Sequence, residues 1–492
     1  MSTKPMNLLY IFSDEHNKDM LGCSGHPVVK TPNIDKLAEE GVRFTRAYCN
    51  SPVCVPSRAS LATGRYIHEI KNWDNAKPYI GEHPSWGHRL VEQDHKVTTI
   101  GKLHYRKPED NVGFPDQRIP LHVYEGIGDT YSLMRDNLTP REINRQKILE
   151  AGSGETSYTR YDRGITEEAI KFLKGEAQEA EKPWALFLGY VTPHFPLIAP
   201  KEYYDLYPLQ DVLLPKQYAL EERPKHPALE IYREIWSVAD EFDEMTLRKA
   251  VAAYYGLCTF MDDQIGAVLQ ALEEEGLLEN TRIIYTSDHG DTLGDHGVWF
   301  KSTMYEGSVG IPFIMSGPDI PKNKVVDTPI SLLDSFPTIL AAVGAELNEE
   351  DQNLPGTDLF PIAKGETDPE RVIFSEYHAM GSVSGVYMIR KGDYKYIHYI
   401  GFEPQLFNLE NDADELNDLA SDPEYALILR ECEIELRKII NPEEVDRQAK
   451  EEQAVMVEGY GGKEKLLEDG FNIPFSPVPP QFLIDKEKPV VR

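Results

Sequence analysis

Leu8-Leu9-Tyr10-Ile11-Phe12 is an apolar run that stops abruptly at Ser13-Asp14-Glu15-His16. A short apolar run of this kind is typical of a strand buried on both faces of a sheet. Three further runs have the same design: residues 97–100 before Gly101-Lys102-Leu103-His104, residues 184–191 before Thr192-Pro193-His194, and residues 283–286 before Ser287-Asp288-His289-Gly290. Ligands of open α/β sheets bind outside the carboxyl ends of the strands. We therefore expect acids, histidines and a lysine to meet at one edge of a sheet.

Helical patterns lie between these apolar runs. One of them has apolar residues at a spacing of three and four, and it places Cys258 on a core face: Tyr254, Leu257, Cys258, Met261, Ile265, Leu269 and Leu272. The Glu273-Glu274-Glu275 run is expected to be a solvated helix end. Together these patterns predict an α/β fold with a large, mixed, mostly parallel sheet between two layers of helices. We assign this domain to residues 1–350.

The pattern changes in residues 351–492, which we assign to a smaller C-terminal α+β subdomain. Short strands are expected at 372–374, 385–390 and 394–398, with a turn at Lys391-Gly392-Asp393 and a helix at 427–440. The tail from Gly470 onward is rich in proline and phenylalanine, with Phe471, Phe475 and Phe482. We expect it to be extended and to pack across a neighbouring subunit of a homo-oligomer, a dimer or a tetramer.

Composition excludes several classes of function. The 492 residues are 41% hydrophobic and 27% charged, which is ordinary for a globular protein, and the net charge is −31. A surface this negative repels nucleic acid and anionic lipid, and an anionic substrate would need local cations. No apolar run is long enough to cross a membrane, and residues 1–12 do not have the pattern of a signal peptide. With only five cysteines, we expect no disulfide framework and a cytoplasmic location.

Ser51-Pro52-Val53-Cys54-Val55-Pro56-Ser57-Arg58-Ala59-Ser60-Leu61-Ala62-Thr63-Gly64-Arg65 carries the most chemical information. Pro56 suits the first turn of a helix and Gly64 can end it, so Cys54 is expected in the loop that leads into a helix N-terminus. Amide donors and the helix dipole favour an anion there, and Arg58 adds a positive charge. The spacing does not fit a zinc site or a cysteine phosphatase. An inert buried cysteine is the alternative.

Cys54-Val55-Pro56-Ser57-Arg58, followed by Leu61, Thr63, Gly64 and Arg65, resembles the signature of the type I sulfatases of the alkaline phosphatase superfamily. The resemblance covers nearly the whole chain. The chain resembles the choline-sulfatase-like and bacterial arylsulfatase-like members, and it is also similar to the phosphonate monoester hydrolases. Leu406-Phe407-Asn408-Leu409 with residues 412–419 is similar to the closing hairpin and helix of the family. The resemblance implies an alkaline-phosphatase-like fold and the hydrolysis of sulfate esters.

The resemblance also implies a modified nucleophile and its helpers. In the family a maturation enzyme oxidises the cysteine to formylglycine (3-oxoalanine), and the hydrate of this aldehyde attacks the ester; here that residue is Cys54. Arg58 and Lys102 would steady the nucleophile, and His104 would take a proton when the aldehyde is regenerated. His194 and Lys301 would bind the sulfate, and one of them would protonate the leaving group.

An acid-rich cation site is expected from Asp14 and Asp288, because each ends a buried strand. The resemblance adds Glu15, His289 and the modified Cys54 as ligands. Glu15 departs from the family pattern, in which Asp, Gln or Asn is commoner, so it is either a ligand or lies behind one. Hard oxygen ligands favour Ca²⁺, while Mg²⁺, Mn²⁺ and Zn²⁺ remain open because His289 is present.

The residues that recognise the ester are harder to predict. A segment rich in tryptophan and histidine either lines the pocket or packs beneath it: Trp73, Asp74, Asn75, Trp86, His88 and Arg89. Among these we select Asn75 as a substrate-binding residue, by similarity to related hydrolases. The alcohol or phenol half of the ester is expected to contact loops within residues 110–160 and 201–245, whereas Asp295 and His296 are expected to have structural roles.

Three functions compete on these residues. The first is hydrolysis of a small soluble sulfate ester. The second is hydrolysis of a phosphonate monoester or phosphate diester with the same nucleophile and metal, which His289 favours over asparagine at that position. The third is a metal-stabilised binding protein with an inactive site, which the intact Cys54 signature argues against.

Overall fold

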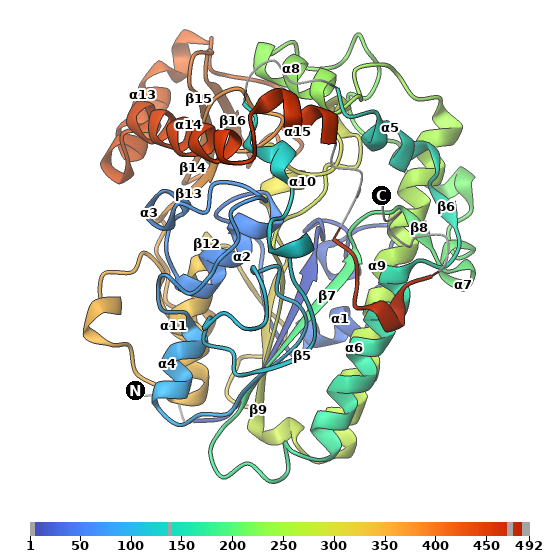
Figure 1. The fold of residues 1–492 in the computed structure, drawn as a ribbon, viewed down its shortest axis with the longest axis vertical. Helices are drawn as coiled ribbons and strands as arrows, with labels where there is room; N and C mark the ends of the chain where they lie inside the picture. Colours follow the sequence, from blue (N-terminus) through green and yellow to red (C-terminus); the bar gives the residue numbers. More distant parts are fainter. Residues whose placement is uncertain (1–4, 136–139, 470–475, 485–492) are drawn as a thin grey trace.

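The computed structural model describes residues 5–135, 140–469 and 476–484. Its centre is an eight-stranded sheet in the order β11-β2-β10-β9-β1-β7-β4-β5 (Figure 1). The strands, in that order, are Lys324–Val326, Gly41–Phe44, Phe313–Ser316, Thr281–Ser287, Asn7–Asp14, Ala185–Pro193, Val97–Lys102 and Asp116–Leu121. Strand β1 is parallel to β7 and β9, and β4 is parallel to β7 and β5, whereas β10 runs antiparallel to β9 and β2. The predicted large, mixed, mostly parallel sheet is confirmed.

Strand β1 shows why the apolar runs form the centre of this sheet. All eight of its residues are buried, and alternate side chains enter different cores. Leu8, Tyr10 and Phe12 contribute to one core, while Leu9 and Ile11 contribute to the other. A strand with an apolar layer on each face needs this continuous run rather than an alternation of apolar and polar residues.

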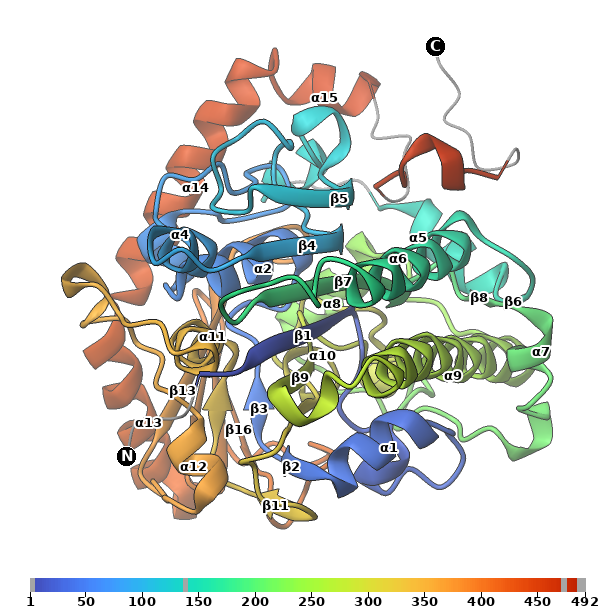
Figure 2. The same cartoon turned by 90° about the horizontal axis from the view of Figure 1, so that it is seen from below.

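Helices cover both faces of the sheet (Figure 2). On one side lie α2 (Cys54–Thr63), α4 (Trp86–Glu92) and α11 (Ser335–Val343). On the other side lie α1 (Pro32–Glu39), α6 (Ser157–Lys174) and the long α9 (Glu244–Glu274). Cys258 is fully buried on α9, as its position in the apolar pattern predicts.

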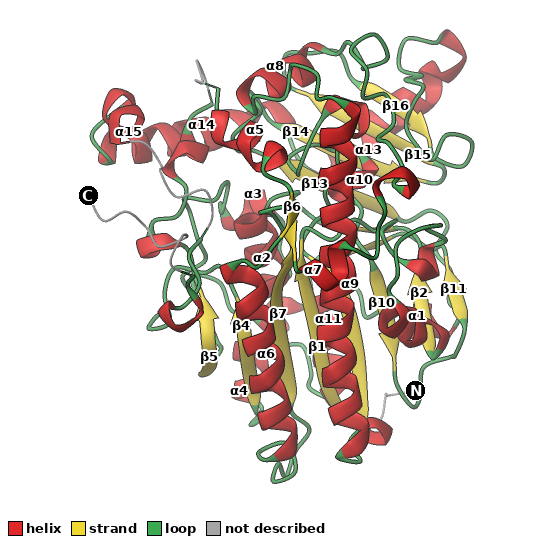
Figure 3. Cartoon of the chain, turned by 90° about the vertical axis from the view of Figure 1, so that its right-hand side faces the viewer, coloured by secondary structure: helices red, strands yellow, loops and turns green. Residues whose placement is uncertain are grey.

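The C-terminal part forms an antiparallel meander above the main sheet (Figure 3). Its strands are β13 (Val372–Tyr377), β14 (Val386–Lys391), β15 (Tyr394–Tyr399) and β16 (Gln405–Asn408), and its helices are α13 (Ala426–Ile439), α14 (Pro442–Gly459) and α15 (Lys463–Asp469). The strands confirm the predicted hairpins. Residues 412–419, however, form no helix, because the Asp412 carboxylate accepts the amides of Leu416 and Asn417 and closes a turn. Met388 and Ile397 share a core cluster with Tyr10 and Phe12.

The remaining elements are short. They are α3 (Ile67–Ile70), α5 (Glu142–Leu149), α7 (Lys201–Tyr204), α8 (Pro227–Ile235), α10 (Glu306–Val309), α12 (Phe360–Lys364), β3 (Ala47–Tyr48), β6 (Gly152–Ser153), β8 (Ile198–Ala199) and β12 (Ile330–Ser331). No helix among the described residues has the length and apolar content that a membrane span requires. All five cysteines lie in the described ranges, and none forms a disulfide there.

Residues 476–484 pack on their own chain, beside α6 (Figure 1). Val478 is buried in the core that α6 and α9 share, and the Phe482 ring lies 5.3 Å from the ring of Tyr161. These residues therefore pack within their own chain, and the contact of the tail with a neighbouring subunit stays a prediction. Phe471 and Phe475 lie outside the described residues.

Candidate active site

Four neighbouring strands, β9, β1, β7 and β4, bring the predicted polar residues to one edge of the sheet. Asp14 ends β1 and Lys102 ends β4, while Asp288 follows β9 and His194 follows β7. All four side chains are buried. The convergence predicted from the four apolar runs is confirmed.

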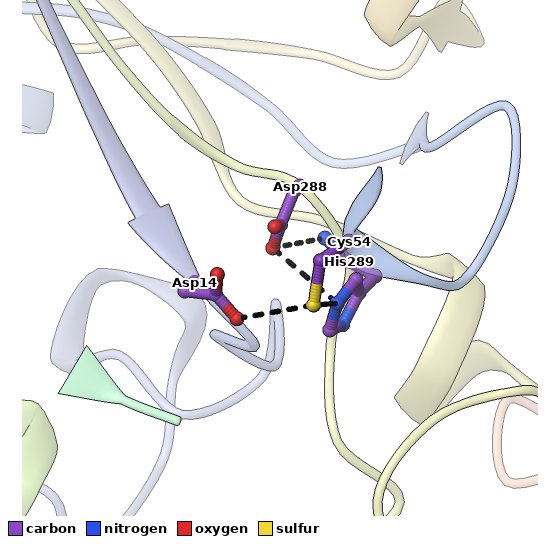
Figure 4. A group of neighbouring side chains, drawn as sticks. All are labelled: Asp14, Cys54, Asp288 and His289. Carbon is purple, nitrogen blue, oxygen red and sulfur yellow. Dashed lines mark hydrogen bonds and ion pairs between the residues drawn. The ribbon is translucent and has the colours of Figure 1, made fainter. Parts of the chain in front are cut away.

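Cys54 is the first residue of α2, whereas the sequence placed it in the preceding loop. Val53 remains extended and Gly64 ends the helix with φ of 67°, as its position predicts. The Cys54 thiol lies 3.2 Å from His289 Nε2 and 3.7 Å from Asp14 Oδ1 (Figure 4). Lys301 Nζ lies 3.3 Å from the same sulfur. The helix start therefore presents residue 54 to both acidic and basic partners.

Arg58 holds the two aspartates together. Its NH2 group lies 2.9 Å from Asp14 Oδ2, and its Nε lies 2.8 Å from Asp288 Oδ2. Lys102 forms a further ion pair with Asp14. Burial opposes ionisation of Asp14, but the charges of Lys102, His194 and Arg58 outweigh it and keep its pKa well below the ordinary value. Asp14 is therefore a carboxylate despite its complete burial.

The residues around Cys54 fit a cation site. Asp14, Cys54, Asp288 and His289 each offer a ligand atom, and these atoms lie within 4.8 Å of one another. His289 Nδ1 lies 3.0 Å from the carbonyl oxygen of Gly290, which leaves Nε2 free as a ligand. Glu15 belongs to an overlapping group with Asp14 and His194, and its Oε1 is buried without a hydrogen-bond partner. Two carboxylates, an imidazole and an unsatisfied buried oxygen are a donor set that a divalent ion would satisfy.

Lys301 and His194 both lie beside the carboxyl group of Glu15. Lys301 Nζ is 3.0 Å and His194 Nε2 is 3.4 Å from Glu15 Oε2. Glu15 adopts a positive φ of 66°, a strained conformation for a non-glycine residue. The carboxylate of Glu15 therefore orients the two side chains that the resemblance assigns to sulfate.

His104 contacts a residue that no sequence pattern indicated. Its Nε2 lies 2.7 Å from Ser476 Oγ, and Tyr158 donates to the Ser476 carbonyl oxygen at 2.9 Å. Burial and the charges of Lys102 and Arg58 hold the pKa of His104 well below its ordinary value, so the imidazole is neutral. The C-terminal segment thus completes the site around a predicted proton acceptor.

A pocket opens above Cys54 and encloses about 810 Å³, including its mouth. Predicted residues that line it are Cys54, Asn75, Lys102, His104, His194 and Lys301. Asn75 Oδ1 also accepts the Val55 amide at 3.2 Å, so Asn75 is tied to the start of α2. The two loops expected to contact the ester contribute Val123, Gly128, Asp129, Ser132, Arg141, Asn144, Lys147 and Trp236. The C-terminal part contributes Tyr377, Ala379, Met380 and Ser476.

The other residues of the tryptophan-rich segment support the structure. Trp73 donates to Glu452, Asp74 accepts from Gln453, and Arg89 pairs with Asp351. Trp86 packs against Phe114, and His88 caps its own helix at Ser85. His296 stacks on Tyr305, and Asp295 accepts the Lys216 amide. None of these side chains lines the described pocket above Cys54.

Comparison with known proteins identifies the family. The sequence profile "Sulfatase" matches residues 6–345, and the profile "N-sulphoglucosamine sulphohydrolase, C-terminal" matches residues 294–442. This protein is a member of the sulfatase family. Choline-sulfatase of Rhizobium meliloti (strain 1021) is 30% identical over 434 residues, which cover 86% of this chain and 84% of the relative. Arylsulfatase K of Canis lupus familiaris is 30% identical over 465 residues, 88% of this chain and 82% of the relative.

The fold is shared with solved structures. The phosphonate monoester hydrolase of Agrobacterium radiobacter superposes with a TM-score of 0.72 at 24% sequence identity. The superposition covers 90% of this chain and 96% of the hydrolase chain. This similarity confirms the alkaline-phosphatase-like fold. The predicted membership of the type I sulfatases and the predicted class of enzyme, a sulfuric ester hydrolase, are confirmed.

Asp162 is a buried residue of α6 that the sequence did not single out. Its carboxylate accepts the amides of Val191 and Thr192 at 2.9 and 2.8 Å, and the Thr192 hydroxyl at 2.6 Å. These bonds fix the backbone two residues before His194. Burial raises the pKa of Asp162 to about 6. Asp162 therefore positions the sulfatase loop that carries His194.

Replacing this carboxylate tests its positioning role. We expect Asp162→Asn to lower kcat/KM on an aryl sulfate by about 10- to 100-fold, because an amide NH₂ would face a backbone N–H and displace His194. Glu167→Gln, on the exposed face of the same helix, is the control and should stay within about twofold. A kcat/KM unchanged in Asp162→Asn would contradict the role.

Proposed function

We propose that this sulfatase hydrolyses the sulfate monoester of a small soluble alcohol or phenol, using formylglycine made from Cys54 and one divalent metal ion. The arrangement that supports this proposal is residue 54 at the start of α2, with His289, Asp14 and Lys301 all within reach of its sulfur. An oxygen nucleophile suits this position, because ligands for a cation and a lysine that can bind an anion both lie close to it.

Each side chain has a role in this proposal. Lys301 and His194 bind the sulfate oxygens and deliver a proton to the leaving oxygen, since both face the pocket beside residue 54. Arg58 and Lys102 keep Asp14 ionised, and Arg58 also holds Asp288 in place. His104 is neutral and can accept a proton from the modified residue 54.

Asp14, Glu15, Asp288, His289 and modified Cys54 are the proposed metal ligands. A divalent ion bound there would act as a Lewis acid and template for the nucleophile and a sulfate oxygen. Ca²⁺ is our first choice because most of the donors are hard oxygens; Mg²⁺, Mn²⁺ or Zn²⁺ are the alternatives that His289 admits. Asn75 completes the proposal as a residue that contacts the substrate.

The proposal extends to assembly and location. We retain residues 1–350 as the catalytic domain and 351–492 as the subdomain that covers it. A formylglycine-generating or equivalent enzyme would mature Cys54. Exposed apolar side chains on α13 and α14, Leu427 at 76% and Val455 at 72%, support a homo-oligomer, a dimer or tetramer. Sparse unpaired cysteines support a cytoplasmic location.

One observation favours a second function. His289 Nε2 lies 3.2 Å from Cys54 Sγ, and the sequence interpretation associates a histidine at this position with phosphonate monoester and phosphate diester hydrolases. These enzymes would use the same nucleophile and cations.

A panel of three substrates tests the proposed function. We expect kcat/KM on nitrophenyl sulfate to exceed that on bis(nitrophenyl) phosphate and nitrophenyl phenylphosphonate by about tenfold or more, because the pocket's cations suit a compact monoanionic head group. The leaving group is the same in all three esters, so the comparison isolates the group transferred. A higher value for the diester or the phosphonate would reverse the assignment.

A further inference from the structure

Lys147 is a cation of the pocket wall without an anionic partner. It belongs to α5 and lines the pocket together with Asn144. Its Nζ lies 3.7 Å from the centre of the Phe195 ring and donates to Asn144 Oδ1 at 3.2 Å. Among the described residues, no carboxylate forms an ion pair with it. A partly buried ammonium held only by an aromatic face and an amide still lacks the counter-ion that such groups usually have.

Asn144 supplies a second unsatisfied donor at the same place. The residue is 1% exposed, and its Oδ1 is the acceptor for Lys147. This bond fixes the amide so that Nδ2 is the remaining group, and Nδ2 is buried without a partner. A buried N–H donor left unpaired costs stability, which a ligand acceptor would recover.

The charges of the pocket lining leave Lys147 in excess. Within the part of the chain that the structure describes, the lining contains a single carboxylate, Asp129, and Arg141 already pairs with it at 2.9 Å. The sulfate end of the substrate is assigned to Lys301 and His194. Burial, together with the charges of Arg141 and Lys301, holds the pKa of Lys147 well below its ordinary value. An anion bound beside Lys147 would raise this pKa and favour the ammonium form.

The two lysines are close enough to contact one small substrate. Lys301 Nζ lies 5.1 Å from the centre of the Phe195 ring, the ring that Lys147 Nζ approaches to 3.7 Å. Both ammonium groups therefore lie near the same phenyl ring, close enough for one small substrate to reach the sulfate position and a second cationic position. We infer that the alcohol or phenol half of the substrate carries a second anionic group, a carboxylate or another sulfate, and that Lys147 and Asn144 bind it.

This inference rests on the proposed function and narrows its substrate class. A quaternary ammonium leaving group, such as the name of the relative choline-sulfatase implies for that protein, would be repelled by Lys147. The inference thus predicts that this sulfatase differs from an enzyme for a cationic ester in the residues of the outer pocket wall. The residues that bind the sulfate group would be alike in the two enzymes.

Aryl sulfates that differ in one ring substituent test the inference. The set is meta-carbamoylphenyl sulfate as the neutral reference, meta-carboxyphenyl sulfate, the meta-phenylene bis-sulfate and meta-(trimethylammonio)phenyl sulfate. We expect kcat/KM for the carboxylate or the bis-sulfate to exceed that of the carbamoyl ester by about tenfold, because the anionic substituent gains a charge-assisted hydrogen bond. Comparing the two anionic esters shows which anion is preferred, and the ammonium ester should be the poorest substrate.

Variants assign the preference to Lys147. Lys147→Met should remove it, mainly through a higher KM for the anionic ester, while the carbamoyl ester stays within about twofold. Lys147→Arg should retain it. Arg145→Gln is the matched control, because it removes one positive charge from the same helix at a side chain that stacks on Phe242 and does not line the pocket.

The outcomes distinguish a failure of this inference from a failure of the proposed function. The inference alone is contradicted if the enzyme hydrolyses the carbamoyl ester and the anionic esters with the same kcat/KM. It is also contradicted if Lys147→Met lowers kcat/KM by the same factor on all esters. Absence of turnover on every sulfate ester by protein modified at residue 54 contradicts the proposed function, and the inference fails with it.

Discussion

Alanine at position 54 should abolish turnover. We expect Cys54→Ala to lower kcat on an aryl sulfate by about 10⁴-fold or more, because loss of a nucleophile leaves only binding and electrostatic stabilisation. The fold should be retained, since the change deletes one small atom, and the free energy of unfolding should fall by no more than about 1–2 kcal/mol. Steady-state kinetics and chemical denaturation on the same preparation measure both quantities.

The chain supplies a matched control for this experiment. Cys49 is also fully buried and lies in the same tryptic peptide, Ala47 to Arg58. Cys49→Ala should keep activity within about twofold. Mass analysis of that peptide should show that residue 54 has lost its sulfur while Cys49 retains it. Activity retained in Cys54→Ala, or an unmodified thiol in fully active protein, would refute the assigned nucleophile.

The fold was predictable where burial imposes a simple pattern on the sequence. Strand β1 has apolar layers on both faces, so Leu8 to Phe12 read as one continuous apolar run. The same pattern located Asp14 and Asp288, because each stands where such a run ends. Helix α14, in contrast, was missed: most of its residues are polar and its buried face includes Asp446 and Gln453, which no apolar periodicity can indicate.

The site was predictable at the strand ends and unpredictable in the pocket wall. Ser476 meets His104 across 372 residues of sequence, and a lone serine in a proline-rich tail has no distinguishing pattern. Lys147 likewise resembles any solvent-exposed lysine of a polar helix until the Phe195 ring is seen beside it. Such residues acquire their roles from tertiary packing, which local propensity and periodicity do not encode.

Removing the guanidinium of Arg58 should have the largest effect on stability. Arg58 is 1% exposed and joins two carboxylates that are completely buried, Asp14 and Asp288. Arg58→Met would leave Lys102 paired with Asp14, whereas Asp288 would keep no lysine or arginine ion pair among the described residues. An uncompensated buried charge costs roughly 3–5 kcal/mol. We expect the free energy of unfolding in metal-free buffer to fall by about that amount, as measured by chemical denaturation.

A divalent cation should recover part of this loss, because the carboxylates that Arg58 neutralises are also the proposed metal ligands. Adding Ca²⁺ should therefore raise the unfolding midpoint of Arg58→Met more than that of the unsubstituted protein. Arg282→Met is the control: Arg282 is equally buried and pairs with Asp319 at 2.7 Å, away from the site. It should be destabilised without gaining a larger response to Ca²⁺. Equal responses to Ca²⁺ in the two variants would separate Arg58 from the metal site, and an Arg58→Met protein as stable as the parent would show that the aspartates do not need it.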